Sequence, residues 1–222
     1  MKNISIILAS GTGERFGENI PKQFYKIKNK TILEYSLDAF EQNKNIDEII
    51  LVTNPNFNDL SREIVFKNNY KKVVKIVNGG ATRVDSSRIG TSYADDDSNV
   101  LIHDAVRAFV TQKIIDDNIE ALKKYEAVGT AIDTIDTIIE IDENGFIKKI
   151  PQRNMLKRIQ TPQSFRAKLI KQAHEIALKN NDKNFTDDCG LILKYNLAPI
   201  FLVHGDEKNL KITQKSDLRQ FI

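Results

Sequence analysis

The segment ILASGTGERFGENIPKQF, from Ile7 to Phe24, begins in an apolar run and carries three glycines and the tripeptide Pro-Lys-Gln. Glycine adopts positive φ at low cost and lets the backbone approach a ligand, so its N–H groups can point at phosphate oxygens. A helix that begins after such a turn adds the positive end of its dipole. We therefore expect a buried strand, then a turn that binds an anion, then a helix.

Apolar runs followed by helical patterns recur along the chain, which is typical of a mostly parallel sheet with crossover helices. Helical patterns cover Thr31 to Asn43, with Leu33, Leu37 and Phe40 on one face, and Gln112 to Tyr125. We predict one α/β domain over residues 1–222, with a three-layer, Rossmann-like architecture. The predicted strands are Ile4 to Leu8, Glu48 to Thr53, Val73 to Val77, Val100 to His103, Ala127 to Ile132 and Ile200 to Val203.

Composition narrows the classes of partner. The net charge is +3, from 33 basic and 30 acidic side chains, so bulk electrostatics predict neither a nucleic-acid nor a membrane partner. No apolar run approaches the ~20 residues of a membrane span. The single cysteine, Cys189, excludes an internal disulfide and a thiolate zinc cluster. Without a basic and apolar leader before the first strand, we expect a cytoplasmic protein.

The segment IDTIIEIDENGFIKKIP, from Ile135 to Pro151, departs from this pattern. It contains two β-type stretches joined by Glu143-Asn144-Gly145, which predicts a hairpin. A hairpin is marginal in water unless it packs on something. We therefore expect an arm, at about residues 135–152, that packs on a second subunit. The alternative is a hairpin folded onto its own domain.

The spacing of the glycines distinguishes three kinds of phosphate-binding turn: a P-loop, a dinucleotide-binding turn, and a turn that binds a nucleoside triphosphate for attack at its α-phosphorus. A P-loop needs Gly-Lys-Ser/Thr, but Gly17 is followed by Glu18, which excludes it. A dinucleotide fingerprint needs G-x-G-x-x-G, and this turn has one residue too many. Arg15 and Lys22 have no use in hydride transfer, whereas attack on the α-phosphorus of a nucleoside triphosphate uses both cations to stabilise charge. An NAD-binding oxidoreductase is thus disfavoured.

The pattern LASGTGERFG...PKQ resembles the signature of nucleotidyltransferases that load a sugar or alditol phosphate onto a nucleotide. It is most similar to the cytidylyltransferases of 2-C-methyl-D-erythritol 4-phosphate and D-ribitol 5-phosphate. The resemblance implies CTP as donor, Mg²⁺ or another divalent cation as cofactor, and Arg15 and Lys22 as catalytic cations on the departing pyrophosphate. It also implies nucleotide contacts from Leu8, Ala9, Ser10, Gly11, Thr12 and Gly13.

NGGATRVDSSRIG, from Asn78 to Gly90, is similar to the family's G-G-x-x-R-x-x-S segment, which holds base and ribose. The resemblance implies nucleotide contacts from Gly80, Ala81, Arg83 and Ser86. Glycine and alanine fit a slot that backbone groups read, because larger side chains would block the base. An exposed helix cap with a solvated arginine is the alternative.

VLIHDAVRAF, from Val100 to Phe109, ends a predicted strand with His-Asp. A carboxylate at the C-terminal edge of a sheet, facing a phosphate loop, suits Mg²⁺, so we expect Asp104 to bind the metal and the nucleotide. Arg107 is expected to bind the acceptor phosphate in bidentate fashion. His103 is expected to position or pack, since a phosphate nucleophile needs no base. Ala108 replaces the proline usual in the family.

In the resembling family the arm is exchanged between two subunits and reaches the partner's acceptor site. This implies a homodimer in which Asp136, Thr137, Arg153 and Thr161 bind the acceptor. The segment FTDDCGLI precedes a predicted helix and supplies two further residues. Thr186 and Asp187 are expected to shape the acceptor pocket, although a helix cap would explain one of them.

GDEKNLKIT, from Gly205 to Thr213, resembles the family's closing motif. It implies that Lys211 contacts the α-phosphate and that Asp206 is a second metal ligand. Arg15, Lys22, Asp104 and Lys211 are all present, which argues against an inactive regulatory homologue. We expect CMP transfer from CTP to a polyol phosphate, with D-ribitol 5-phosphate preferred, 2-C-methyl-D-erythritol 4-phosphate as the alternative, and glycerol phosphate more remote.

Overall fold

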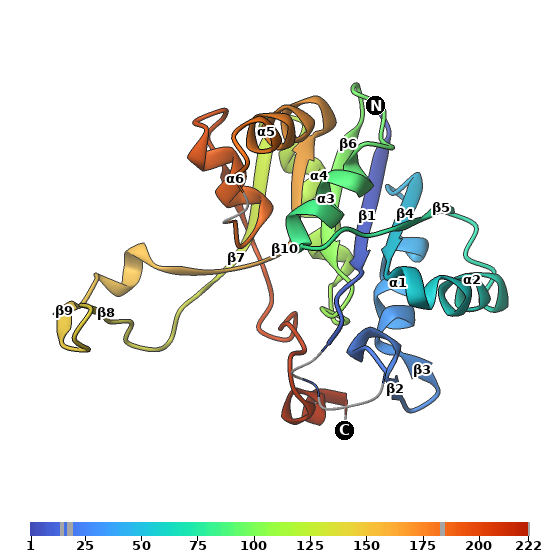
Figure 1. The fold of residues 1–222 in the computed structure, drawn as a ribbon, viewed down its shortest axis with the longest axis horizontal. Helices are drawn as coiled ribbons and strands as arrows, with labels where there is room; N and C mark the ends of the chain where they lie inside the picture. The colour runs from blue at the N-terminus through green and yellow to red at the C-terminus, as the bar shows by residue number, and fades with distance from the viewer. Residues whose placement is uncertain (14–15, 17–19, 183–184, 222) are drawn as a thin grey trace.

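The computed structural model describes residues 1–13, 16, 20–182 and 185–221 (Figure 1). Its strands are β1 (Asn3–Ala9), β2 (Lys26–Ile27), β3 (Lys30–Thr31), β4 (Glu48–Thr53), β5 (Val73–Asn78), β6 (Asn99–Asp104), β7 (Ala127–Asp133), β8 (Glu140–Ile141), β9 (Ile147–Lys149), β10 (Lys157–Arg166) and β11 (Phe201–His204). Its α-helices are α1 (Ile32–Gln42), α2 (Asn58–Lys67), α3 (Arg83–Thr91), α4 (Gln112–Ala121), α5 (Ala167–Lys179) and α6 (Asp188–Lys194). Short 3-10 helices are η2 (Lys22–Phe24), η3 (Pro55–Phe57), η4 (Arg153–Met155) and η5 (Lys215–Phe221).

Seven strands form one sheet in the order β11-β7-β10-β6-β1-β4-β5. The pairs β1–β4, β1–β6, β4–β5 and β7–β11 are parallel, whereas β10 runs antiparallel to both β6 and β7. The six predicted strands are confirmed. β10 was not predicted, because the buried stretch Gln160–Ser164 is polar and gives no apolar run.

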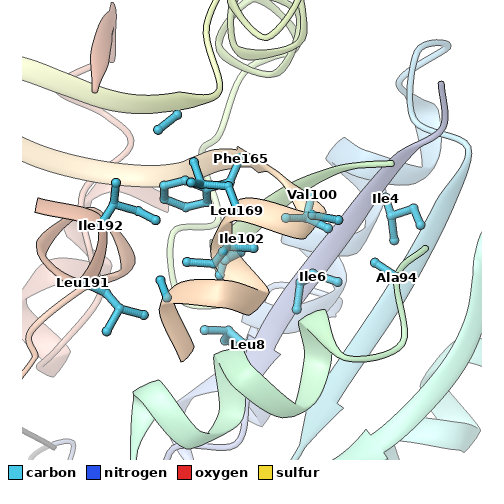
Figure 2. Close-up of a cluster of buried hydrophobic side chains, with 14 of the residues drawn as sticks. Ile4, Ile6, Leu8, Ala94, Val100, Ile102, Phe165, Leu169, Leu191 and Ile192 are labelled. Carbon is cyan, nitrogen blue, oxygen red and sulfur yellow. The ribbon is translucent and has the colours of Figure 1, made fainter. Parts of the chain in front are cut away.

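Alternation along β1 builds the three layers. Ile4, Ile6 and Leu8 pack on the face covered by α3, α5 and α6, in the cluster of Figure 2. Ile7 and Ala9 pack on the opposite face, against α1, α2 and α4. Because side chains alternate across a strand and both faces of the sheet are covered, both sets of side chains in β1 are buried, and the strand is mostly apolar apart from Asn3 and the buried Ser5.

The first crossover helix forms as its sequence predicts. Thr31 accepts a hydrogen bond from the Glu34 amide, and the Glu34 carboxylate accepts one from the Thr31 amide, a capping box that satisfies two free N–H groups. Leu33, Leu37 and Phe40 are fully buried beneath α1. The α4 helix ends at Ala121, about one turn before the predicted end at Tyr125.

The predicted hairpin is present, and it extends well away from the sheet (Figure 1). Glu140 and Ile141 pair with Lys149 and Ile147, and the turn closes between Asp142 and Phe146. Its large apolar side chains are exposed: Ile135, Ile138, Ile139, Ile141, Phe146, Ile147 and Ile150. The structure therefore contains the protruding arm rather than a hairpin packed on its own body. Among the described residues, no helix has both the length and the apolar character needed to span a membrane.

Candidate active site

A cavity of about 680 Å³ opens where the C-terminal ends of β1, β4, β5 and β6 meet. In parallel sheets this edge is where ligands bind, because loops and helix N-termini converge there. The lining residues are Leu8, Ala9, Ser10, Gly11, Thr12, Gly13, Lys22, Gln23, Asn54, Gly80, Ala81, Thr82, Arg83, Asp104, Val106 and Lys211. Segments from the beginning, the middle and the end of the chain thus form one site.

The glycine turn has the conformation that its sequence requires. Gly13 has φ of 74°, and a Cβ there would lie 2.9 Å from the Lys22 backbone nitrogen, so a larger residue would be strained. The buried Gln23 amide donates to the carbonyl oxygens of Ala9 and Gly11, at 2.6 and 2.8 Å. These two bonds hold the turn open. The predicted cation Arg15 and the third glycine, Gly17, lie outside the described residues.

The segment that starts α3 closes against this turn. Ser10 Oγ lies 2.7 Å from Ser86 Oγ, and Ser86 Oγ also accepts the Gly80 N–H at 3.2 Å. A Cβ on Gly79 would lie 2.4 Å from the Ser10 Cβ, so only glycine allows this approach. Ser86 is buried and does not line the cavity, so in this structure it holds together the two loops predicted to bind nucleotide.

Asp104, at the end of β6, is the electrostatic centre of the cavity. Its Oδ1 lies 2.9 Å from Arg83 Nε, and its Oδ2 lies 2.8 Å from Lys211 Nζ. Burial favours the neutral acid, but the two cations outweigh it and hold the pKa of Asp104 well below its usual range. The carboxylate is therefore ionised, and both of its oxygens are paired.

His103 and Thr161 form a buried support behind Asp104. Thr161 Oγ1 accepts the Asp104 N–H at 3.1 Å, so we assign its proton to His103 Nδ1, 3.0 Å away. His103 Nε2 then donates to the Arg107 carbonyl at 3.2 Å. Burial lowers the pKa of His103 to about 4, so the ring is neutral. This is the positioning role expected for His103, whereas the acceptor contact of Thr161 remains a prediction.

Most predicted acceptor residues lie away from the cavity of their own chain. Arg153 Nη2 donates to Thr137 Oγ1 at 3.0 Å, which joins two of them on the arm beside the exposed Asp136. Thr186 is exposed before α6. Arg107 is mostly buried, and its Nη1 donates to the Asn209 carbonyl at 2.8 Å. None of these side chains lines the cavity.

Asp187 caps α6, since it accepts the Gly190 N–H at 2.9 Å. Its other carboxylate oxygen accepts from the Gln163 side chain at 2.9 Å. The sequence predicted that one of Thr186 and Asp187 caps this helix, and the structure shows that it is Asp187. Whether Asp187 also shapes an acceptor pocket remains a prediction.

The donor set fits a divalent cation held mainly by a ligand's phosphates. Among the described residues, Asp104 is the one carboxylate that lines the cavity, and there is no cluster of three or more His, Cys, Asp or Glu side chains. Mg²⁺ commonly binds one or two carboxylates together with substrate phosphates, so Asp104 satisfies the protein's share. Asp206 does not line the cavity, and its carboxylate accepts the Lys208 N–H. Its role as second ligand stays a prediction.

Among the described residues, sequence reasoning missed four that line the cavity: Gln23, Asn54, Thr82 and Val106. Asn54 follows β4 directly and donates to the Ser10 carbonyl at 3.4 Å. A polar residue just past a predicted parallel strand is a usable signal, because these strand ends share one edge. Gln23 lies in the Pro-Lys-Gln tripeptide of the glycine turn, but its partners are backbone carbonyls, so nothing in the sequence indicated what its side chain does.

Comparison with known proteins agrees with this geometry. Residues 4–221 match the family model described as IspD, 2-C-methyl-D-erythritol 4-phosphate cytidylyltransferase. The enzyme of that name from Clostridium tetani is 41% identical over 217 residues, covering 98% of this chain and 87% of the relative. The corresponding Bifidobacterium longum enzyme is 37% identical and covers 97% of this chain and 77% of the relative.

Solved structures show the same likeness. The 4-diphosphocytidyl-2C-methyl-D-erythritol synthase of Anaerococcus prevotii superposes with a TM-score of 0.87 at 33% identity, covering 99% of this chain and 95% of the other. The Francisella tularensis 2-C-methyl-D-erythritol 4-phosphate cytidylyltransferase gives a TM-score of 0.79 at 31% identity, covering 99% and 98%. The predicted nucleotidyltransferase fold is confirmed.

The comparisons confirm the cytidylyltransferase activity but not the preference for ribitol 5-phosphate. The relatives are named as enzymes that act on 2-C-methyl-D-erythritol 4-phosphate, which was predicted from the sequence as the alternative acceptor. These names do not support the preference for ribitol 5-phosphate and agree instead with that alternative. From its match over almost the whole length, this chain belongs to the IspD family of cytidylyltransferases.

Proposed function

We propose that this protein transfers CMP from CTP to 2-C-methyl-D-erythritol 4-phosphate and releases pyrophosphate. The observation that carries this proposal is the cavity that joins the glycine turn, Lys22, Asp104 and Lys211 at one edge of the sheet. The names of the relatives support the choice of acceptor.

The reaction is an in-line displacement at phosphorus. An oxygen of the acceptor phosphate attacks the α-phosphorus of CTP, a P–O–P bond forms, and the bond to the β-phosphate breaks with its electron pair on pyrophosphate. The nucleophile is already an anion, so no general base is required. Positioning alone can lower the barrier by roughly 7–11 kcal/mol at most, and charge stabilisation lowers it further.

The cations of the cavity have separate tasks in this proposal. Lys211 is bound to Asp104 in this structure, and it would move to the α-phosphate as charge develops there. Lys22, on the other side of the glycine turn, and Arg15 would stabilise the departing pyrophosphate. A divalent cation bound by Asp104 and the phosphates would supply Lewis-acid stabilisation of the same charge.

We also propose that the protein is a homodimer whose arms complete each other's acceptor sites. The exposed apolar residues of the arm support this, because side chains such as Phe146, 72% exposed, are costly to leave in water. The bond between Arg153 and Thr137 also supports it, since it prearranges a polar pair on the arm, outside the cavity of its own chain.

Pyrophosphate release tests the reaction and the acceptor together. The protein is assayed with CTP and Mg²⁺ against 2-C-methyl-D-erythritol 4-phosphate, ribitol 5-phosphate and glycerol 3-phosphate, side by side. We expect kcat/KM to be highest for the methylerythritol compound. A higher kcat/KM with ribitol 5-phosphate would overturn the choice of acceptor, and no release with any of the three would overturn the reaction.

A further inference from the structure

A second buried carboxylate, Asp188, lies behind the cavity at the first residue of α6. Asp188 is 1% exposed. Oδ2 lies 2.8 Å from Arg83 Nη1, and Oδ1 accepts the Ser87 hydroxyl at 2.5 Å. The Asp188 N–H donates to Gln163 Oε1 at 3.0 Å. Contacts from α3 and β10 therefore fix the position of this carboxylate.

Arg83 bridges Asp188 and Asp104. Its Nε pairs with Asp104 and its Nη1 with Asp188, while Nη2 is buried without a hydrogen-bond partner. Burial lowers the pKa of Arg83, but the two carboxylates more than offset it and raise the pKa above its usual value. Only the planar, forked guanidinium can bind two carboxylates through separate nitrogens in this way, since a lysine has one ammonium.

We infer that Asp188 is a positioning residue, which holds Arg83 against the cavity wall so that Arg83 shares the Asp104 carboxylate with Lys211. This rests on the proposed function, in which Lys211 must leave Asp104 for the α-phosphate, and on the prediction from the sequence that Arg83, which lines the cavity, binds the nucleotide. Arg83 on Oδ1 leaves Oδ2 to Lys211. Without Asp188, the Arg83 guanidinium would be paired, among the described residues, only with Asp104. It could then rotate and contact both oxygens of the Asp104 carboxylate, including the one that Lys211 uses.

Two other side chains near Asp188, those of Ser87 and His174, do not supply a positive charge in place of Arg83. Ser87 uses its proton on Asp188, so we assign Nε2 of the buried His174 as donor to Ser87 Oγ, 3.2 Å away. Burial lowers the pKa of His174 to about 4, so it carries no charge that could balance Asp188. In the described part of the chain, the ion pair of Asp188 is with Arg83. The two side chains thus form one unit.

The test combines single and double variants with calorimetric titration of CTP and with initial rates of pyrophosphate release. Asp188→Asn keeps the shape of the side chain but removes its charge. We expect the Kd and KM for CTP to rise about 10- to 100-fold, the scale for removing a group that orients a binding residue. Asp188→Glu, which keeps the charge, should recover part of this loss. Asp59→Asn, which removes an acid from the first turn of α2, is the matched control and should leave both constants unchanged.

The double variant decides whether Asp188 acts through Arg83. If it does, Arg83→Gln combined with Asp188→Asn binds CTP no more weakly than Arg83→Gln alone. Additive losses, or a Kd within twofold of the native protein for Asp188→Asn, would overturn the inference. If Asp188→Asn does not fold, Arg83→Lys is tested instead, because the Arg83 side chain is partly exposed and its replacement is better tolerated. Arg83→Lys should lose affinity for CTP to a similar extent. A native affinity for CTP would refute the role of Arg83 as a bridge between Asp104 and Asp188.

These readouts separate this inference from the proposed function. A native protein that binds CTP but releases no pyrophosphate with any acceptor would overturn the reaction, while calorimetry would still measure the coupling between Asp188 and Arg83. A native protein that neither binds CTP nor releases pyrophosphate would overturn both.

Discussion

Lys211 and Asp104 form an ion pair in the lining of the cavity, with Nζ 2.8 Å from Oδ2. Lys211 follows the last strand of the sheet, whereas Asp104 ends a central strand. The Asp104 carboxylate is buried, and the Lys211 side chain is 40% exposed. The lysine is therefore the partner that can move when a more highly charged ligand enters.

Lys211→Ala tests this movement. Loss of a preorganised cation at the α-phosphate should reduce kcat by about 10²- to 10³-fold, the usual cost of deleting one transition-state donor. Steady-state pyrophosphate release measures the change. Lys208→Ala removes an exposed lysine from the same loop and should retain native turnover. A Lys211→Ala protein with native kcat would show that the pair with Asp104 has no catalytic use.

Lys22→Ala should also lower kcat, by about 10²- to 10³-fold, because the charge of the leaving pyrophosphate would lose a donor at the glycine turn. The exposed Lys26, just past η2, provides the control Lys26→Ala. Turnover within a factor of two of the native protein would mean that the turn binds some other ligand.

Gln23→Glu should weaken both the fold and CTP binding. The amide of Gln23 donates to two backbone carbonyls, and a carboxylate would place a third acceptor there. Leaving such groups buried and unsatisfied costs about 1–3 kcal/mol of the free energy of unfolding. Urea unfolding and the KM for CTP measure the two effects. Gln42→Glu, at the exposed end of α1, is the matched control, and equal stability of the two variants would contradict the role of Gln23.

Mixing two inactive variants tests the shared acceptor site. Arg153→Ala should lose affinity for the acceptor, and Lys211→Ala should lose turnover. In a mixed dimer, one site receives a native Lys211 from its own chain and a native Arg153 from the partner. After subunit exchange at equal concentrations, we expect up to about a quarter of native activity, since half of the dimers are mixed and half of their sites are intact. No recovery, in a preparation whose dimers have exchanged, would place the arm's residues in their own site.

Asp104→Asn should change how stability depends on pH. Burial raises the pKa of Asp104, but the two cations outweigh it and depress the pKa in the folded state, so its stabilising contribution is present above its unfolded pKa of ~3.9 and is lost as pH falls from that value toward the lower folded pKa. The difference in free energy of unfolding between the native protein and Asp104→Asn should therefore shrink between pH 6 and pH 3. Urea titrations at each pH measure it, with the exposed Asp97→Asn as control. A constant difference would show that the charge of Asp104 is not stabilised by folding.

Much of the fold followed from local pattern. Strand β1 was predicted from a short apolar run that ends at a glycine turn, and helix α1 from apolar residues that recur about every four positions on one face. Strand β10 was not predicted, because its buried polar side chains form hydrogen bonds with groups distant in the sequence. Gln160 donates to the Asp206 carbonyl, and Gln163 donates to the Asp187 carboxylate. Such partners leave no trace in the order of residues along the chain.

The same division applies to the site. Glycines, cations and the strand-end Asp104 were recognisable in the sequence because phosphate binding demands those residue types near one edge of a parallel sheet. What needed three dimensions was the pairing of charges: Asp104 between Arg83 and Lys211, and Arg83 between Asp104 and Asp188. Residue types come from chemistry that acts at short range along the chain, whereas ion pairs form between whichever charged groups the packed sheet brings within a few ångströms.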